Sequence, residues 1–393
     1  MTGSPAAALS ESSRGFDPRV FLLAIGTFAT GTDTFVIAGI LPELSRSLSV
    51  TIEAAGAVVS VYALVYGIGT PLLALVVGRW RQDRVALAAL IAFIVVNLLC
   101  AVAPSYAFLI VMRAAAALCA AAYAPAAYVM AAASARPEKR GSALAAVALG
   151  SSGSTVAGVP LGTFIGNHFG WPATFVMIAV ITAIALIALF AGGPRTADIP
   201  PPLPLAERVA PLARLRVWIA LAPVLLMFCG IYALYTYIAP LLETRFAASD
   251  VPLFLMCYGA GGIVGSQFGG KLVDRFGATR PLLVLLSVFA LLNALLAIAL
   301  HSWLTAGLVM FGLTLCSWAC FAPIQTRIVA VEPEHANVMF ALINAAIFFG
   351  GAVGAALGGA VLSVSSVTAL PYTAAILAAL AVAMIAQSGN LRR

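Results

Sequence analysis

The sequence predicts an all-α integral membrane protein with twelve transmembrane helices, arranged as two parallel six-helix bundles. Of its 393 residues, 63% are hydrophobic and only 9% are charged, which is too little polar surface for a water-soluble chain. Apolar stretches of about 20 residues recur along the whole chain, and each can cross a hydrocarbon core as a helix. Backbone groups without access to water must bond internally, so we expect helices and not an open sheet.

The spans follow in order from the apolar stretches. In the first bundle, residues 18–193, we expect helices over approximately 18–41, 54–77, 84–103, 105–132, 141–166 and 172–193. In the second bundle, residues 216–388, we expect them over 216–241, 252–273, 280–300, 303–326, 336–362 and 366–388. Polar tails, residues 1–17 and 389–393, flank the bundles, and a proline-rich linker, residues 194–215, joins them. The first stretch is too long for a cleaved signal peptide and lacks a clear cleavage site.

The basic residues predict the orientation of the chain. Eighteen of the 21 lysines and arginines fall on the side of the N-terminus, whereas Arg46 and Arg245 fall on the opposite side. The remaining one, Arg113, lies within a helix. Because cytoplasmic segments carry an excess of basic residues, we expect both termini and the linker to be cytoplasmic.

The two halves repeat. The segment 158–162 of the fifth helix recurs as 354–358 in the eleventh, 196 residues later, and the segment 41–43 that ends the first helix has a counterpart at 241–243. Six helices per unit is an even number, so both units have the same orientation. Such parallel repeats form a central site between two halves that can rock against each other.

One acid and one base lie deep within predicted helices. Asp33 and Arg113 are each about 12 Å from the outer ends of their helices at the rise of 1.5 Å per residue. A charge at that depth costs about 2.5–3.5 kcal/mol on insertion scales, so we expect the two to pair. Together they can set a proton affinity that changes as the site opens. The alternative is a structural ion pair that only fixes the first helix against the fourth.

Aromatic and polar residues within the helices are candidates for the wall of a substrate cavity. Cavities for organic molecules are mostly apolar with a few polar groups. The candidates in the second half are Tyr235, Asn344, Tyr232, Tyr237, Trp318 and Phe321, with Tyr235 and Asn344 first. Those in the first half are Tyr123, Tyr62 and Tyr66. For each of them, packing between helices is the alternative.

Glycines mark two further segments. Gly158, Pro160 and Gly162 in the fifth helix favour close helix packing with some bending. The segment 270–277 is expected to be a charged loop between the eighth and ninth helices. On its charges alone, we interpret this loop only as a marker of the topology, that is, of the side of the membrane on which it lies.

Several kinds of chemistry have no support in the sequence. The six cysteines show neither a disulfide framework nor a zinc pattern, and there is no nucleotide-binding loop or catalytic cluster. We therefore expect no metal, cofactor, ATP or nucleic acid, and no enzymatic activity.

The twelve helices and the repeat, together with the segment Gly270-x-x-x-Asp274-Arg275-x-Gly277, resemble the major facilitator superfamily over nearly the whole chain. The resemblance implies that Gly270, Asp274, Arg275 and Gly277 form a cytoplasmic gate motif.

A narrower resemblance rests on the segment Gly31-Thr-Asp33-x-Phe35-Val-Ile-Ala-Gly39-Ile-Leu-Pro42, on Arg113 and on the segment 158–162. These are similar to motifs of the bacterial drug:proton antiporter branch with twelve spans. That branch includes chloramphenicol and multidrug exporters and sugar exporters of the arabinose-efflux type. The resemblance implies proton coupling by Asp33 and Arg113, and an antiporter motif formed by Gly158, Pro160 and Gly162.

The expected function is therefore a proton-coupled exporter of small organic molecules. It would work by alternating access, as a monomer, in the bacterial cytoplasmic (inner) membrane. Hydrophobic drugs, amphenicols and sugars remain open as substrates. The alternatives are an uptake carrier that works by proton symport and a membrane receptor that does not transport.

Overall fold

The computed structural model describes residues 18–78, 80–136, 139–194 and 210–390. The predicted tail 1–17, most of the linker 194–215 and residues 391–393 lie outside the described residues. Eleven helices are long and apolar enough to cross a membrane, and one pair of helices, bent by 50°, makes a twelfth span. The predicted all-α membrane fold with twelve spans is thus confirmed.

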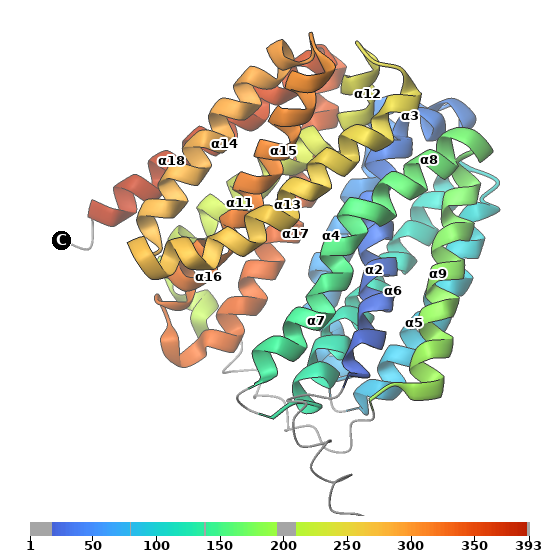
Figure 1. Ribbon diagram of the computed structural model, residues 1–393, viewed down its shortest axis with the longest axis vertical. Coiled ribbons are helices and arrows are strands. Elements are labelled where there is room, and N and C mark those ends of the chain that lie inside the picture. The colour runs from blue at the N-terminus through green and yellow to red at the C-terminus, as the bar shows by residue number, and fades with distance from the viewer. Residues whose placement is uncertain (1–17, 79, 137–138, 195–209, 391–393) are drawn as a thin grey trace, which may run out of the picture.

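The first six spans form one half of the molecule, drawn in blue to green in Figure 1. The first span is broken into two helices and the fifth contains a π-helical turn, η2. The helices are α2 (Val20–Phe35), α3 (Ile37–Ser47), α4 (Ile52–Val76), α5 (Gln82–Ala101), α6 (Tyr106–Ala133), α7 (Arg140–Gly153), η2 (Ser154–Gly158), α8 (Val159–Phe169) and α9 (Trp171–Gly192).

The last six spans form the other half, drawn in yellow to red. The seventh and tenth spans are each made of two helices. The helices are α11 (Leu215–Tyr235), α12 (Ile238–Glu243), α13 (Val251–Phe276), α14 (Thr279–Ala299), α15 (Trp303–Ala319), α16 (Phe321–Val329), α17 (Ala336–Val364) and α18 (Leu370–Asn390).

The placement of segment 270–277 in a loop was wrong. Helix α13 continues to Phe276, so Gly270, Asp274 and Arg275 are helical, and only Gly277 lies beyond its end. Gly277 has φ +72°, a conformation that glycine adopts at low cost and that commonly ends helices. The Arg275 guanidinium lies 5.3 Å from the centre of the Phe276 ring. The charged side chains of this turn are exposed, at the end of the molecule that carries the termini.

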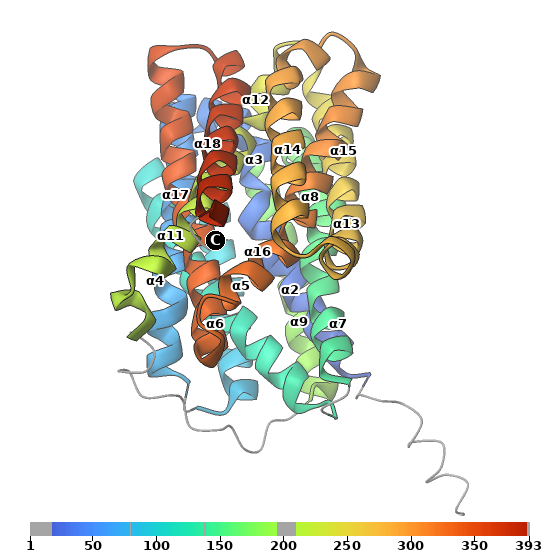
Figure 2. The same ribbon diagram turned by 90° about the vertical axis from the view of Figure 1, so that its left-hand side faces the viewer.

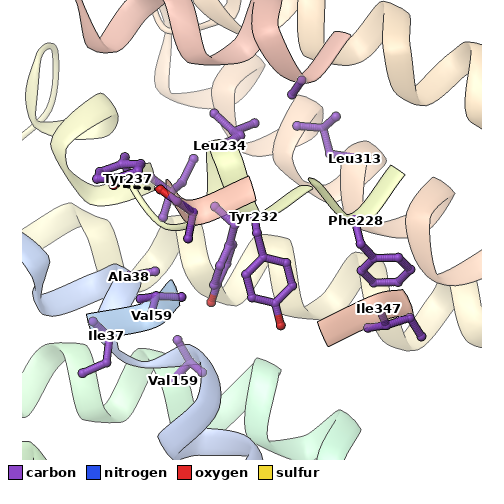
Figure 3. Packing of buried hydrophobic residues seen from close by; sticks show 14 of the residues in the cluster. Ile37, Ala38, Val59, Val159, Phe228, Tyr232, Leu234, Tyr237, Leu313 and Ile347 are labelled. Atoms are coloured by element: carbon purple, nitrogen blue, oxygen red, sulfur yellow. Dashed lines mark hydrogen bonds between the residues drawn. The ribbon is translucent and has the colours of Figure 1, made fainter. Parts of the chain in front are cut away.

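The halves join mainly through α4 with α17 and through α13 with the fifth span, and they also meet where α3 contacts α12. The rings of Tyr66 and Phe348 stack across the first pair with centroids 3.9 Å apart. At the end opposite the termini, Asn167 Nδ2 donates to the Ala248 carbonyl at 3.0 Å. One core of buried apolar residues runs through both halves; Figure 3 shows Val59 and Val159 of the first half near Tyr232 of the second. Figure 2 shows the same two groups of helices from the side.

The described end of the linker is tied to the second half. Arg214, directly before α11, and Arg216, within it, both pair with Glu332 in the loop between α16 and α17. The hydrogen bond from Arg214, together with the charge of both arginines, holds the pKa of Glu332 below its ordinary value. These contacts fix the point at which the linker enters the seventh span.

Glycines set the spacing between helices within each half. A Cβ on Gly158 would lie 2.0 Å from Thr32 Oγ1, and one on Gly162 would lie 2.6 Å from Val36 Cγ2, so the fifth span packs tightly on the first. In the second half, a Cβ on Gly354 would lie 2.2 Å from the Cys229 carbonyl oxygen. The predicted close packing at these glycines is confirmed.

Gly150 tests this packing, because a Cβ there would lie 2.0 Å from the Ala24 carbonyl oxygen, a backbone atom that cannot rotate away. We expect Gly150→Ala to lower the free energy of unfolding by about 1–3 kcal/mol through overpacking. Gly141 in the same helix has no atom within 4 Å of its Cβ position. Gly141→Ala should therefore leave stability unchanged or raise it by up to about 1 kcal/mol. Melting temperatures in one detergent compare the two variants, and equal values would contradict the close contact.

Candidate functional site

The break in the first span prepares the site. Thr30, Thr32 and Thr34 donate their hydroxyl groups to backbone carbonyls one turn earlier, a pattern that bends helices. The helix stops at Phe35 and restarts at Ile37. Across this break the carbonyls of Asp33 and Phe35 accept hydrogen bonds from side chains of other spans.

Asp33 and Arg113 form a fully buried ion pair. Arg113 Nη1 lies 2.5 Å from Asp33 Oδ1, and Arg113 Nη2 donates to the Asp33 carbonyl oxygen at 3.0 Å. Both side chains are 0% exposed. The predicted pairing at equal depth is present in the structure. Since an isolated buried charge is strongly unfavourable, each residue depends on the other.

Aromatic rings cover the guanidinium. Its carbon lies 4.3 Å from the centre of the Tyr62 ring and 5.7 Å from that of Phe175. Cation–π contacts of this kind strengthen when water is excluded. The rings therefore hold Arg113 in place against the first span.

The ion pair is incompletely hydrogen-bonded. Among the described residues, Asp33 Oδ2 and Arg113 Nε have no hydrogen-bond partner, although both atoms are buried. A buried polar atom without a partner costs about 1–3 kcal/mol. The carboxyl group therefore has one oxygen that is free to take up a proton.

A cavity of about 330 Å³ lies between the halves, next to this pair. Its wall contains aromatic side chains and several hydroxyl groups, and none of the described residues that line it is charged. The lining residues are Thr30, Gly31, Thr34, Phe35, Tyr66, Ala124, Tyr128, Ala148, Ser151, Ser152, Thr155, Phe228, Ile231, Tyr232, Tyr235, Tyr258, Ser317, Trp318, Phe321, Asn344, Ile347 and Phe348.

Six of the predicted cavity residues lie in this wall, namely Tyr235, Asn344, Tyr232, Trp318, Phe321 and Tyr66, whereas Tyr62 and Tyr237 do not. The Tyr235 hydroxyl donates to the Phe35 carbonyl oxygen at 3.3 Å, so it also links the two halves. Asn344 Nδ2 donates to the Phe340 carbonyl within its own helix at 3.0 Å.

The prediction for Tyr123 was wrong. This side chain is 1% exposed, and its hydroxyl donates to the Leu23 carbonyl oxygen at 2.9 Å. Gly26 makes room for the ring, since a Cβ there would lie 2.1 Å from the Tyr123 hydroxyl oxygen. Tyr123 therefore packs α6 against α2 and lies outside the cavity wall.

Two tyrosines of the wall were not predicted, Tyr128 and Tyr258. Tyr128 follows Ala124 by four residues, so the two share one face of α6. Tyr258 follows Tyr62 by 196 residues, which is the repeat offset found in the sequence. Both spacings can be found in the sequence alone.

The ion pair can be tested through stability. Arg113→Met leaves the Asp33 carboxylate buried without its partner, which should lower the free energy of unfolding by about 3–5 kcal/mol. The double variant Asp33→Asn with Arg113→Met removes both charges and should recover most of that loss. Melting temperatures at neutral pH measure the difference. A double variant that melts no higher than Arg113→Met would contradict mutual stabilisation.

Residues 23–330 match the family profile of the Major Facilitator Superfamily. The inner membrane transport protein YdhP of Escherichia coli (strain K12) is 33% identical over 374 residues, 94% of this chain and 95% of YdhP. A chloramphenicol resistance protein of Streptomyces lividans is 32% identical over 271 residues, 68% of each chain. A bacterial homologue of the human lysosomal transporter Spinster, solved in an inward-facing and unoccupied conformation, matches with a TM-score of 0.75. That match has 17% identity and covers 94% of this chain and 97% of the other.

These relatives agree with the antiporter branch that the sequence resembles, and they are transporters and not enzymes. A profile match over most of the chain, a relative of similar length and the shared fold lead to one conclusion: this chain belongs to the major facilitator superfamily of membrane transporters.

Proposed function

We propose that the protein is a proton-coupled exporter of small organic molecules in the bacterial inner membrane. The observation that carries the proposal is the buried pair of Asp33 and Arg113 beside the cavity. Asp33 lies between Thr30 and Thr34 on α2, and both threonines line the cavity. An intramembrane carboxylate in such a place is by default a candidate proton carrier.

Protonation of Asp33 would remove one charge of the pair and weaken its attraction for Arg113. The carboxyl group lies two residues before Phe35, whose carbonyl accepts the cross-half bond from Tyr235. A shift of α2 at Asp33 therefore reaches both the cavity wall and a contact between the halves. The same segment of α2 thus takes part in both protonation and the contact between the halves, so it can couple protonation to their rocking.

The conformation fits a carrier open toward the end that holds the termini. Cross-half contacts lie at mid-depth, as with Tyr66 and Phe348, and at the opposite end, as with Asn167 and Ala248. A separate apolar cluster packs the first half near the termini, and it includes Val20, Val85 and Met130. We infer that substrate enters from the side of the termini, which the distribution of basic residues places in the cytoplasm.

Two observations support export over uptake. The fifth span carries the motif of Gly158, Pro160 and Gly162, directly after a π-helical turn that contacts α13 of the other half. A relative that covers 68% of the chain is a chloramphenicol resistance protein. Proton symport on the same fold is the second candidate, because the ion pair itself does not set the direction.

The cavity wall favours uncharged aromatic or amphipathic molecules as substrates. Rings such as Tyr232, Trp318 and Phe321 offer stacking surfaces, while Asn344 and Ser317 offer polar contacts. Since no residue in the described part of this wall is charged, an organic anion would lose its hydration without gaining a cationic partner there. This argument places neutral compounds ahead of organic acids.

Transport by Asp33→Asn tests proton coupling. We use everted membrane vesicles with an acidic interior and radiolabelled chloramphenicol as the probe. The wild type should accumulate the probe when energised, and Asp33→Asn should abolish energised accumulation but keep exchange of labelled for unlabelled probe. Glu334→Gln, which changes an exposed acid in a loop, is the matched control. Accumulation by Asp33→Asn at the wild-type level would refute coupling, and proton-driven loss from preloaded vesicles would indicate uptake in the cell.

The aromatic wall is tested by Trp318→Ala. Loss of one stacking contact should raise the Kd for chloramphenicol by about two- to ten-fold, which corresponds to about 0.5–1.5 kcal/mol. Trp80→Ala, at an exposed position outside the cavity, should leave the Kd unchanged. Equilibrium binding to purified protein measures both values. An unchanged Kd in Trp318→Ala would exclude that ring from the binding site.

A further inference from the structure

Tyr62 lies between the cavity wall and the ion pair, yet it belongs to neither. Its side chain is 2% exposed, and it is absent from the cavity lining among the described residues. On the cavity side, Thr34 Oγ1 lies 3.2 Å from the Tyr62 hydroxyl oxygen, within hydrogen-bond distance. Thr34 itself lines the cavity. The Tyr62 hydroxyl is therefore one hydrogen bond away from the cavity.

On its other side, Tyr62 faces the ion pair. Its ring lies under the Arg113 guanidinium, whose carbon is 4.3 Å from the ring centre, and its hydroxyl lies close enough to the Asp33 carboxyl group to act on it electrostatically. Asp33 Oδ2 is buried and has no hydrogen-bond partner among the described residues. Besides Arg113 and Tyr62, the thiols of Cys100 and Cys119 lie within electrostatic range of this carboxyl group. Neither thiol lines the cavity.

We propose that the hydroxyl groups of Thr34 and Tyr62 relay protons between water in the cavity and Asp33. This inference rests on the proposed proton coupling and names the route that it uses. Asp33 is 0% exposed, so a proton needs an intermediate group to reach it from the cavity. Hydroxyl groups suit this task because each can accept one hydrogen bond while donating another.

In this relay each hydroxyl group accepts one proton and passes on its own. A hydronium ion in the cavity gives a proton to Thr34 Oγ1, whose own proton passes to the Tyr62 hydroxyl oxygen. The Tyr62 proton then passes to Asp33 Oδ2, which becomes a neutral carboxylic acid, while water remains in the cavity. Rotation of both hydroxyl groups restores the starting arrangement, and the reverse sequence releases the proton.

Thr34 also contains a switch. Its hydroxyl lies 2.8 Å from the Thr30 carbonyl oxygen and 3.2 Å from the Tyr62 hydroxyl oxygen, but it has only one hydrogen to donate. When the hydrogen points to Thr30, the relay is interrupted. When it points to Tyr62, the relay is connected. Because Thr34 forms part of the cavity wall, a bound substrate can bias this choice.

Paired variants test the relay. Tyr62→Phe keeps the ring under Arg113 and removes only the hydroxyl group, whereas Thr34→Val removes the other hydroxyl at nearly constant volume. We expect both to slow energised chloramphenicol accumulation at least about ten-fold, in line with the loss of a positioned proton-transfer group. For Tyr62→Phe, whose hydroxyl group does not line the cavity, chloramphenicol exchange and Kd should stay near wild type. Thr34→Ser restores a hydroxyl group and should restore accumulation.

Tyr123→Phe is the matched control. It also removes a buried tyrosine hydroxyl from a hydrogen bond in the first half, but this hydroxyl bonds to α2 and is not part of the cavity wall, so the variant should accumulate the probe like the wild type. Wild-type accumulation by Tyr62→Phe and Thr34→Val, together with its loss in Asp33→Asn, would refute the relay alone. Wild-type accumulation by all three would refute proton coupling through Asp33 as well. Equal loss in Thr34→Ser and Thr34→Val would show a structural role of Thr34 and overturn its place in the relay.

Discussion

The structure depends on satisfying two opposite charges in a region without water. Arg113 neutralises Asp33 and donates a second bond to its backbone carbonyl. That carbonyl is available because the first span is broken at Val36, and threonine side chains bend the helix just before it. The break, the rings over the guanidinium and the depth of both charges thus form one arrangement. Removal of one member would leave the others without their partners.

Each half of the molecule is tightly packed, and the ion pair lies within the first half. Glycines bring the fifth span against the first and α17 against α11, close enough that a Cβ would meet backbone atoms. Bodies packed in this way move as units, since close-packed interiors do not deform continuously. The irregular elements, namely the breaks at Val36 and Thr236 and the π-helical turn, lie in the spans that border the cavity. Flexibility is therefore confined to the surface between the halves.

Much of the fold could be predicted from the sequence, because span length and charge distribution respond directly to the bilayer. The pairing of Asp33 with Arg113 followed from equal depth, without knowledge of any contact. The orientation of the Tyr123 side chain could not be predicted, because its depth in the membrane does not show which face of α6 meets α2. The extension of α13 to Phe276 was hidden because the charged segment suggested a loop, whereas only Gly277 ends the helix. The break at Val36 has no proline or glycine to mark it and depends on bonds from other spans.

Asp33 is, among the described residues, the one acidic side chain buried within a span, and the segment alignment places Ala233 opposite it in the second half. A lone carboxylate binds a single proton per cycle. If, as proposed, one proton is exchanged for one uncharged molecule, each turnover would carry one net positive charge inward. The electrical potential then contributes about 2.3 kcal/mol per 100 mV to accumulation against a gradient. Such a carrier would be electrogenic, and it would keep working in alkaline surroundings where the pH difference across the membrane vanishes.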